Sequence, residues 1–244
     1  EIGGIWFDGE WDQFKWDGKR FGEPMADFKL AEVYSLIHKL QPQALIGSNH
    51  HLAPNPGEDF QMFEKDLPGR STKSFATSAD DIGNLPLEVC ETINGSWGFN
   101  LKDRKHKSKK ELVQYLIKAA GYDSNLLLNV GPMPNGKIQE EHIKSLKEIG
   151  DWIKVNGETI YGTIRGPIDP TDEIASTQKD NTIYIHLLDN RKTYFIEGYN
   201  PKIKKISYYH SNKKVKYQKT KSGLIINVDD NELDEIDTII ELEI

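Results

Sequence analysis

Short apolar runs alternate with amphipathic segments over the first two thirds of the chain. Four of these runs have the composition of strands buried on both faces: 2–7, 44–48, 87–93 and 125–130. Between or after them, apolar residues recur at helical spacing over 30–40, 112–120 and 143–153. A further short strand is expected over 159–163. Strand followed by helix, repeated, predicts a parallel α/β sheet with right-handed crossovers.

The predicted helices have start and stop signals of their own. Asp27 is placed to cap the first, and Pro42 follows its end. Ser108 and Glu111 have the spacing of a capping box, and Gly121 is the expected stop of the second helix. Asn156-Gly157 ends the third.

The longest connections come directly after strands. They cover 8–25, 49–86 and 94–107 and contain Pro and Trp. Such loops at the carboxyl ends of strands form the active sites of (β/α)8 barrels. An open doubly wound sheet is the alternative, but no Gly-rich phosphate loop follows any strand. We therefore predict an α/β fold that is part of a (β/α)8-type barrel.

The pattern changes near residue 168, after which no helical periodicity is found. Six short segments separated by turn residues predict a small antiparallel β-sandwich: 182–187, 193–196, 203–208, 215–218, 224–228 and 238–244. The chain is thus predicted to contain residues 1–167 as the C-terminal portion of a barrel and 168–244 as a sandwich. Four or five barrel strands fall short of the eight in a complete barrel of about 250 residues. We expect the N-terminal half of the barrel to lie outside this sequence.

Composition removes several function classes. Among 244 residues, 31 Lys and Arg stand against 38 Asp and Glu, a net charge of −7, whereas nucleic-acid binders are normally basic. No run reaches the roughly 20 apolar residues that span a bilayer. A single cysteine excludes an internal disulfide and favours the cytoplasm, although localisation and secretion stay open. Homo-oligomerisation is also left open.

Asp8 ends the first predicted strand, within a stretch that also holds Trp6 and Trp11. The tryptophans offer flat apolar faces for stacking on a sugar, and an acid at this place suits a nucleophile that attacks an anomeric carbon. Asp8 as a simple turn cap is an equal alternative. A cation site with Glu10 and Asp12 is disfavoured, because the loop lacks the glycine and distal glutamate of a calcium loop.

The stretch after the second strand is rich in polar side chains. Asn49, His50 and His51 can hydrogen-bond sugar hydroxyls, while zinc is disfavoured because no third ligand has suitable spacing. No metal or cofactor is expected. Three acids could serve as general acid and base opposite Asp8, or simply face solvent: Glu58, Asp59 and Glu64. Trp97, between glycines just past the third strand, suits a binding cleft or a core anchor.

Several motifs in order together resemble one enzyme family. They are WFDG (6–9), GEDFQMFE (57–64) with LPG (67–69), LEVCET (87–92) leading into NGSWG (94–98), and LLLNVGP (126–132). This set is similar to the α-L-fucosidases of glycoside hydrolase family 29. The resemblance covers residues 4–163, and the predicted sandwich matches the C-terminal domain of that family in kind.

The resemblance implies a retaining hydrolase of terminal α-L-fucosyl linkages that acts on fucosylated glycans. It implies Asp8 as nucleophile, Trp6 and Trp97 in the fucose pocket, and His50 and His51 nearby. Glu64 is the first choice for the acid/base. Its reserves are Asp59, Glu58 and Glu88, because this position differs among subgroups of the family.

The family's pocket also uses residues from the first barrel strands, so we expect this chain to need the N-terminal half, in the same or a separate polypeptide. Three alternatives stay open: a glycosidase for another sugar, a non-catalytic remnant, and a carbohydrate-binding module. The last would use a strip of sandwich tyrosines, namely Tyr194, Tyr199, Tyr208, Tyr209 and Tyr217.

Overall fold

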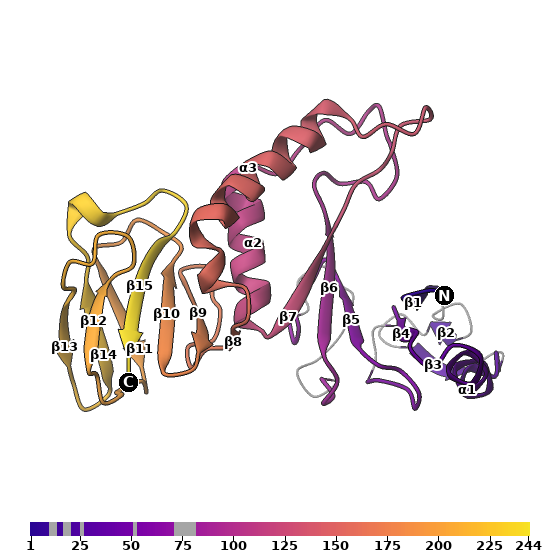
Figure 1. Cartoon of the computed structure of the whole chain (residues 1–244), viewed down its shortest axis with the longest axis horizontal. Helices are drawn as coiled ribbons and strands as arrows, with labels where there is room; N and C mark the ends of the chain where they lie inside the picture. Colours follow the sequence, from indigo (N-terminus) through magenta and orange to yellow (C-terminus); the bar gives the residue numbers. More distant parts are fainter. Residues whose placement is uncertain (10–13, 17–20, 25–26, 51–52, 71–81) are drawn as a thin grey trace. The chain divides into compact units, whose positions relative to one another are not determined.

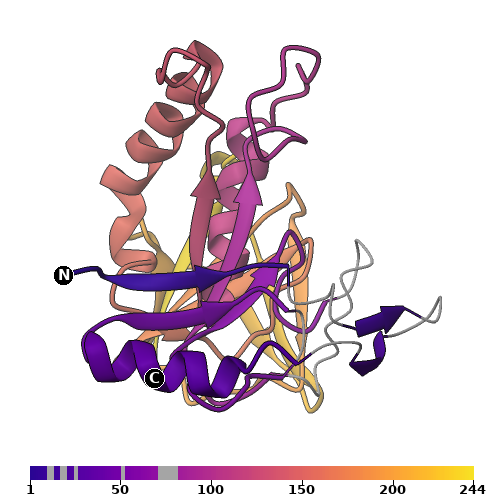
Figure 2. The ribbon, with the colours of Figure 1, turned by 90° about the vertical axis from the view of Figure 1, so that its right-hand side faces the viewer.

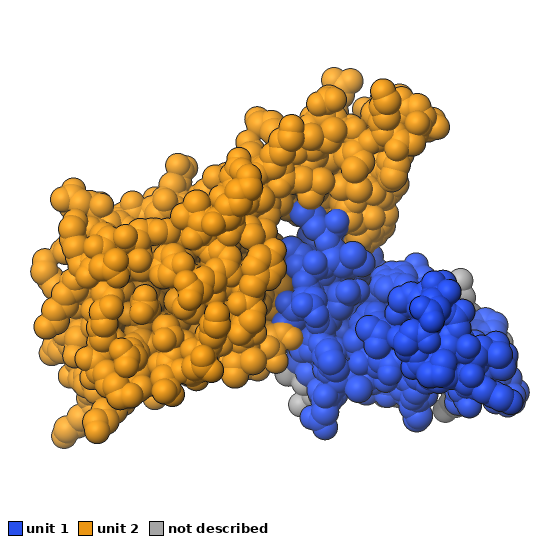
Figure 3. Space-filling model, viewed as in Figure 1, with its two compact units in different colours: residues 1–91, 124–128 blue, residues 92–123, 129–244 orange. Residues whose placement is uncertain are grey.

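The computed structural model describes residues 1–9, 14–16, 21–24, 27–50, 53–70 and 82–244. These residues divide into two compact units (Figure 3). Unit 1 contains residues 1–91 and 124–128, and unit 2 contains residues 92–123 and 129–244. None of the helices in the described part of the chain has the length and apolar character needed to cross a membrane.

Unit 1 begins with a strand–helix–strand element. Strand β1 (Gly4–Phe7) pairs in parallel with β4 (Leu45–Ser48), and helix α1 (Leu30–Leu40) connects them. Figure 2 shows α1 running alongside both strands. The ring of Tyr34 is fully buried and meets Phe7 edge to face, with ring centroids 5.2 Å apart. This aromatic contact packs α1 onto β1.

The other strands of unit 1 form two small sheets. Strands β2 (Phe14–Trp16) and β3 (Phe21–Pro24) pair antiparallel. Strand β5 (Gln61–Glu64) is parallel to β6 (Leu87–Thr92), and β7 (Ser124–Asn129) is next in that sheet. Parallel β1–β4 and β5–β6 pairs agree with the predicted α/β class.

Two helices and an antiparallel region make up unit 2. Helices α2 (Lys109–Gly121) and α3 (Glu140–Asn156) contact each other, and α2 also packs on β9. The strands, coloured orange to yellow in Figure 1, are β8 (Ile164–Arg165), β9 (Ile174–Lys179), β10 (Thr182–Leu187), β11 (Thr193–Glu197), β12 (Lys205–Tyr208), β13 (Lys216–Lys219), β14 (Gly223–Asn227) and β15 (Thr238–Glu243).

These strands form two antiparallel sheets around one core. The first has the order β12-β15-β10-β9-β8, and the second β11-β14-β13. One buried cluster draws Ile185 and Ile240 from the first sheet and Leu224 and Ile226 from the second. Two sheets that share an apolar core are a sandwich. The predicted order, α/β followed by an antiparallel β-sandwich, is confirmed.

Of the two helix starts predicted from capping residues, the structure confirms one. The capping box is present: Ser108 Oγ accepts a hydrogen bond from Glu111 N, and the Glu111 carboxylate accepts one from Ser108 N. The predicted cap by Asp27 is wrong, because α1 starts after Lys29, which adopts a left-handed conformation with φ 55°. The Asp27 carboxylate accepts from Lys29 N instead, in a local turn.

Strand prediction failed where the polar pattern was misleading. The strand expected over 159–163 is wrong: a 3₁₀ turn, η3 (Gly157–Thr159), stands at its start, and the N–H groups of Ile160 and Tyr161 donate back to Gly157 O. Strand β5 falls within the connection predicted over 49–86, because its apolar run is only the pair Met62-Phe63 between Gln61 and Glu64. Strand β9 was missed since it is mostly polar, yet Ser176 and Thr177 are fully buried.

Candidate active site

Asp8 lies immediately after β1, at the carboxyl end of the parallel pair. The ladder continues one step beyond the strands, because Asn49 N donates to Phe7 O at 2.9 Å. Asp8 and Asn49 are therefore held side by side. Gly9, at φ +83°, turns the chain away and donates its N–H to Asp8 Oδ1 at 3.1 Å. The Asp8 side chain is exposed, as is Trp6, which lies two residues earlier on the same face of β1.

Asn49 links the two acids at the centre of the site. Its Nδ2 donates to Asp8 Oδ1 at 3.3 Å and to Glu64 Oε2 at 2.9 Å. Glu64 is the last residue of β5. Since one nitrogen reaches both, these two oxygens lie at most about 6 Å apart. Carboxyl groups are about 5–5.5 Å apart in retaining glycosidases and about 6.5–9.5 Å apart in inverting ones.

Glu64 reaches this place because the segment before β5 is docked on β4. The N–H groups of Asp59 and Phe60 both donate to Ile46 O, at 2.7 and 3.4 Å. The Phe60 ring covers Gly47 so closely that a Cβ there would lie 2.3 Å from its Cζ. Glycine at position 47 is therefore a packing requirement of the site.

Two predicted site residues, His50 and Glu58, face each other in the interior of unit 1. His50 Nε2 lies 2.9 Å from Glu58 Oε1 and 3.1 Å from Oε2. Tyr34 donates its hydroxyl to Glu58 Oε1 at 3.4 Å. The side chains of His50 and Glu58 are 2% and 0% exposed. This pair ties the residue after Asn49 to helix α1.

Asp59 has a comparable role nearer the surface. Its Oδ2 accepts the Ile46 N–H at 2.8 Å and lies 2.9 Å from His38 Nε2. Sequence reasoning missed His38 and Tyr34 as partners of these acids. Tyr34 belongs to the apolar stripe that predicts this helix, and the sequence gives no separate role to His38, although their four-residue spacing puts both on one face of α1.

Glu88 shares a face with Glu64 in the β5–β6 pair. Glu64 is opposite Cys90 in the register, and Glu88 is two residues before it on the same strand. Partial burial raises the pKa of Glu88. Burial and the neighbouring carboxylates of Glu64 and Glu88 raise the pKa of Cys90 to about 12. The acids therefore shape the electrostatics of this face.

The remaining predicted site residues are Trp97 and His51. Trp97 belongs to unit 2, where its side chain is exposed and its carbonyl accepts from Asn129 Nδ2 at 2.8 Å. His51 and the acids Glu10 and Asp12 lie outside the described residues. No three His, Cys, Asp or Glu side chains in the described ranges are grouped so as to hold a metal ion.

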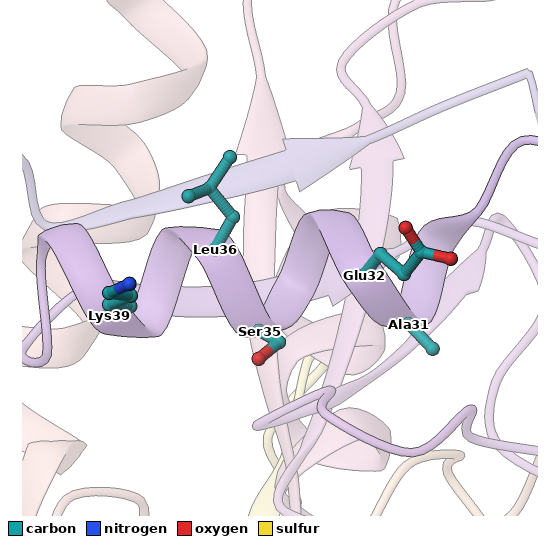
Figure 4. A pocket seen from close by; sticks show the side chains of 5 residues that line it. All are labelled: Ala31, Glu32, Ser35, Leu36 and Lys39. Carbon is teal, nitrogen blue, oxygen red and sulfur yellow. The ribbon is translucent and has the colours of Figure 1, made fainter.

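A surface hollow on the exposed face of α1 is separate from these acids. Ala31, Glu32, Ser35, Leu36 and Lys39 line it (Figure 4). All five come from one helix, so among the described residues no groups from a second element converge there. Binding sites usually have such convergent polar groups, and the acids around Asn49 fit that description better.

Comparison with known proteins places the chain in a family. A family model described as alpha-L-fucosidase matches residues 1–158. This chain belongs to the alpha-L-fucosidase family. Plasma alpha-L-fucosidase of Pongo abelii is 30% identical over 161 residues, which are 55% of this chain and 35% of that protein. The chain thus spans well under half the length of this fucosidase relative.

Solved fucosidases have the same fold. Alpha-L-fucosidase isoenzyme 1 from Paenibacillus thiaminolyticus is 30% identical, with a TM-score of 0.75, over 99% of this chain and 57% of that one. A fucosidase from Bacteroides thetaiotaomicron, solved as a trapped covalent intermediate, is 16% identical, with a TM-score of 0.74, over 99% of this chain and 56% of that one. The second likeness concerns the fold alone.

Proposed function

We propose that the chain is the C-terminal part of a retaining exo-α-L-fucosidase that hydrolyses terminal α-L-fucosyl linkages of glycans. The observation that supports this most directly is the single amide nitrogen of Asn49 within hydrogen-bonding distance of both Asp8 and Glu64. It keeps one oxygen of each carboxylate within about 6 Å of the other, which is below the spacing of inverting enzymes and compatible with a nucleophile and an acid/base in a retaining site. Membership of the alpha-L-fucosidase family supports fucose as the sugar that is released.

The proposed mechanism is double displacement. In the first step the Asp8 carboxylate attacks the anomeric carbon while the bond to the leaving oxygen breaks, and Glu64 gives that oxygen its proton. In the second step Glu64, now a base, takes a proton from water, which displaces Asp8 and releases fucose. The Bacteroides fucosidase trapped as a covalent intermediate provides a precedent in a protein of the same fold.

Trp6 is proposed as a wall of the fucose pocket. It is 40% exposed and shares the outer face of β1 with Asp8, so its indole is open for stacking on an apolar sugar face. Trp97 and His51 stay proposed substrate contacts on the strength of the family resemblance. Asn49, expected as a substrate contact from its place after a strand, instead has its amide nitrogen on the two acids. Glu58, Asp59 and His50 fit that role less well, because their polar groups bind one another, His38 and backbone.

Glu64 is favoured as acid/base over its reserves for geometric reasons. Glu58 is closed to solvent, and Asp59 is held by Ile46 N and His38. Glu88 is the second choice, since a raised pKa keeps a carboxyl protonated for acid catalysis. Glu64→Gln and Glu88→Gln separate the two, because loss of the acid slows hydrolysis of poor leaving groups far more than of good ones.

We also propose that residues 1–167 need a partner barrel half. The match covers only 57% of the Paenibacillus fucosidase and 35% of the plasma fucosidase, and a barrel site draws residues from several strands. The test is to assay 4-nitrophenyl α-L-fucoside with the 244-residue chain alone, and then with the upstream barrel half added. Turnover that needs both pieces and is lost with Asp8→Gly supports the proposal. Strong hydrolysis by the single chain would refute the need for a partner half.

A carbohydrate-binding strip on the sandwich is not supported. Tyr194 and Tyr208 are only 4% and 2% exposed and belong to the sandwich core. Specificity for a sugar other than fucose is the alternative that an assay decides. A panel of aryl glycosides that includes galactosides and xylosides identifies the preferred glycone.

A further inference from the structure

The side-chain amide of Asn49 is used asymmetrically. Its nitrogen donates to both acids, whereas its Oδ1 is buried with no hydrogen-bond partner in the part of the chain that the structure describes. The whole residue is 1% exposed. A buried amide that leaves its oxygen without a partner loses free energy, so the two bonds of its nitrogen must compensate.

The two acids fix the orientation of this amide. An ionised carboxylate only accepts hydrogen bonds, and an asparagine amide has two N–H donors on one end and an acceptor on the other. If the amide turned over, Oδ1 would face the Asp8 nucleophile, which must be ionised to react, with no proton between the two oxygens. The donor end therefore stays on Asp8 and Glu64.

The backbone around Asn49 is held firmly enough for this role. Its N–H is bonded to Phe7 O, the neighbouring His50 is fixed by Glu58, and β4 precedes it directly. Catalytic groups need supporting residues whose own conformation is locked. Asn49 meets this requirement, while Asp8 is exposed and Glu64 is only half-buried.

We propose that Asn49 is a positioning residue that selects which oxygen of each acid reacts. Both hydrogen bonds of the Asp8 carboxylate within the described residues, from Gly9 N and Asn49 Nδ2, end on Oδ1. Oδ2 is then the oxygen that forms the bond to the anomeric carbon. Glu64 Oε2 is kept as an acceptor, so the proton passed to the leaving oxygen is carried on Oε1. This inference rests on the proposed function of Asp8 and Glu64.

The first test compares two replacements of Asn49 in the 244-residue chain assayed with the upstream barrel half, with 4-nitrophenyl α-L-fucoside as substrate. Asn49→Ala is expected to lower kcat/KM about 10²-fold, the usual effect of misplacing reacting groups by about 1 Å. Asn49→Asp has the same shape but no donor at neutral pH, and it adds a third carboxylate. At pH 7 it is expected to be worse than Asn49→Ala. It should recover relative to the parent as pH falls, because a protonated carboxyl can donate.

A merely structural role predicts the opposite order, with the isosteric Asn49→Asp more active than Asn49→Ala, and this result would overturn the proposal. A sugar-binding role is distinguished by inhibition with L-fucose. Positioning leaves its inhibition constant within about twofold in Asn49→Ala, whereas loss of a hydroxyl contact raises the constant together with KM.

Asn156→Ala is the matched control. Asn156 is also a buried asparagine whose Oδ1 has no partner among the described residues, but its Nδ2 donates to the backbone oxygen of Trp152 in α3. Its replacement should lower stability and leave the pH–rate profile unchanged. A profile shift equal to that of the Asn49 variants would count against a specific effect at Asn49.

The second test needs no turnover, which separates this inference from the proposed function. Side-chain amide signals of ¹⁵N-labelled 244-residue chain are compared between the parent, Asp8→Gly and Glu64→Gln. Each substitution is expected to move the Asn49 Nδ2 proton signals, with the Asn156 signals unchanged. Asn49 signals that respond to neither substitution overturn the inference, whether or not the protein hydrolyses fucosides. A response of the Asn49 signals, together with no fucoside hydrolysis even when the upstream barrel half is added, supports the Asn49 bridge and removes the proposed function alone.

Discussion

His50 and Glu58 form a closed pair one residue away from the bridge between the two acids. The imidazole Nε2 lies 2.9 Å from one oxygen of the carboxylate and 3.1 Å from the other, and neither side chain is open to solvent. The pair thus fixes the chain where it leaves β4, immediately after Asn49. An acid that at first resembles a catalytic candidate is in this way part of the support of the site.

Glu58 and Glu64 should therefore respond to substitution in different ways. Glu58→Ala removes the acceptor of His50 and Tyr34 and is expected to lower the free energy of unfolding by about 1–3 kcal/mol. Glu64→Gln should change stability by no more than about 0.5 kcal/mol and abolish most turnover of poor leaving groups. Urea denaturation and fucoside assays measure both effects. A Glu58→Ala protein as stable as the parent would contradict the structural role.

Glu88 makes the stability of the chain depend on pH. Burial raises its pKa above the ordinary value of 4.5 in the folded state, so the unfolded chain ionises first as pH increases. The stability that protonated Glu88 contributes is fully present below pH 4.5, and it is lost as pH rises through the pKa of Glu88 in the folded state. Relative to the parent, Glu88→Gln should gain thermal stability between pH 4 and pH 7.5. Glu235→Gln, at an exposed acid, is the control and should show no such gain.

Cys90 should be inert in the folded protein. It is 4% exposed, and burial together with Glu64 and Glu88 raises its pKa to about 12. Because the thiolate is the reactive form, a thiol reagent such as iodoacetamide at pH 8 should leave the native chain unmodified. The same reagent in guanidinium chloride should label one site per chain. Rapid labelling without denaturant would show that this face of β6 is open.

The cap of α2 gives a prediction for unit 2. Ser108→Ala removes the side-chain acceptor of Glu111 N and should cost about 1 kcal/mol. Ser108→Thr keeps an oxygen at that position and should cost less. The midpoint of thermal unfolding is measured for both variants. Equal decreases of the midpoint in the two variants would mean that packing, and not capping, is what Ser108 contributes to stability.

Local signals in the sequence identified much of this fold. The capping box at Ser108, the alternation within β10 and the apolar runs of β1, β4 and β6 each reflect short-range rules, and the structure contains all of them. Strand β9 was missed because its burial comes from α2, which is distant in sequence, and not from its own apolar content.

The site was predictable in its residue types but not in its pairing. Position after a strand singled out Asp8 and Asn49, and the parallel register of β1 and β4 explains why the two meet. Nothing along the chain separates Glu58 from Glu64, six residues apart. One faces Tyr34 and His50 in the interior, and the other reaches Asn49, because of how Phe60 docks over Gly47.

The strand order of the larger sheet has a consequence for how the protein is made. Strand β15 (Thr238–Glu243) lies between β12 and β10 and pairs with both. On the ribosome, β10 and β12 emerge first and have no common neighbour until residues 238–243 follow. A premature stop before residue 238 would therefore remove an interior strand and not an edge. It would leave two open strand edges, and such edges pair readily with other chains during synthesis.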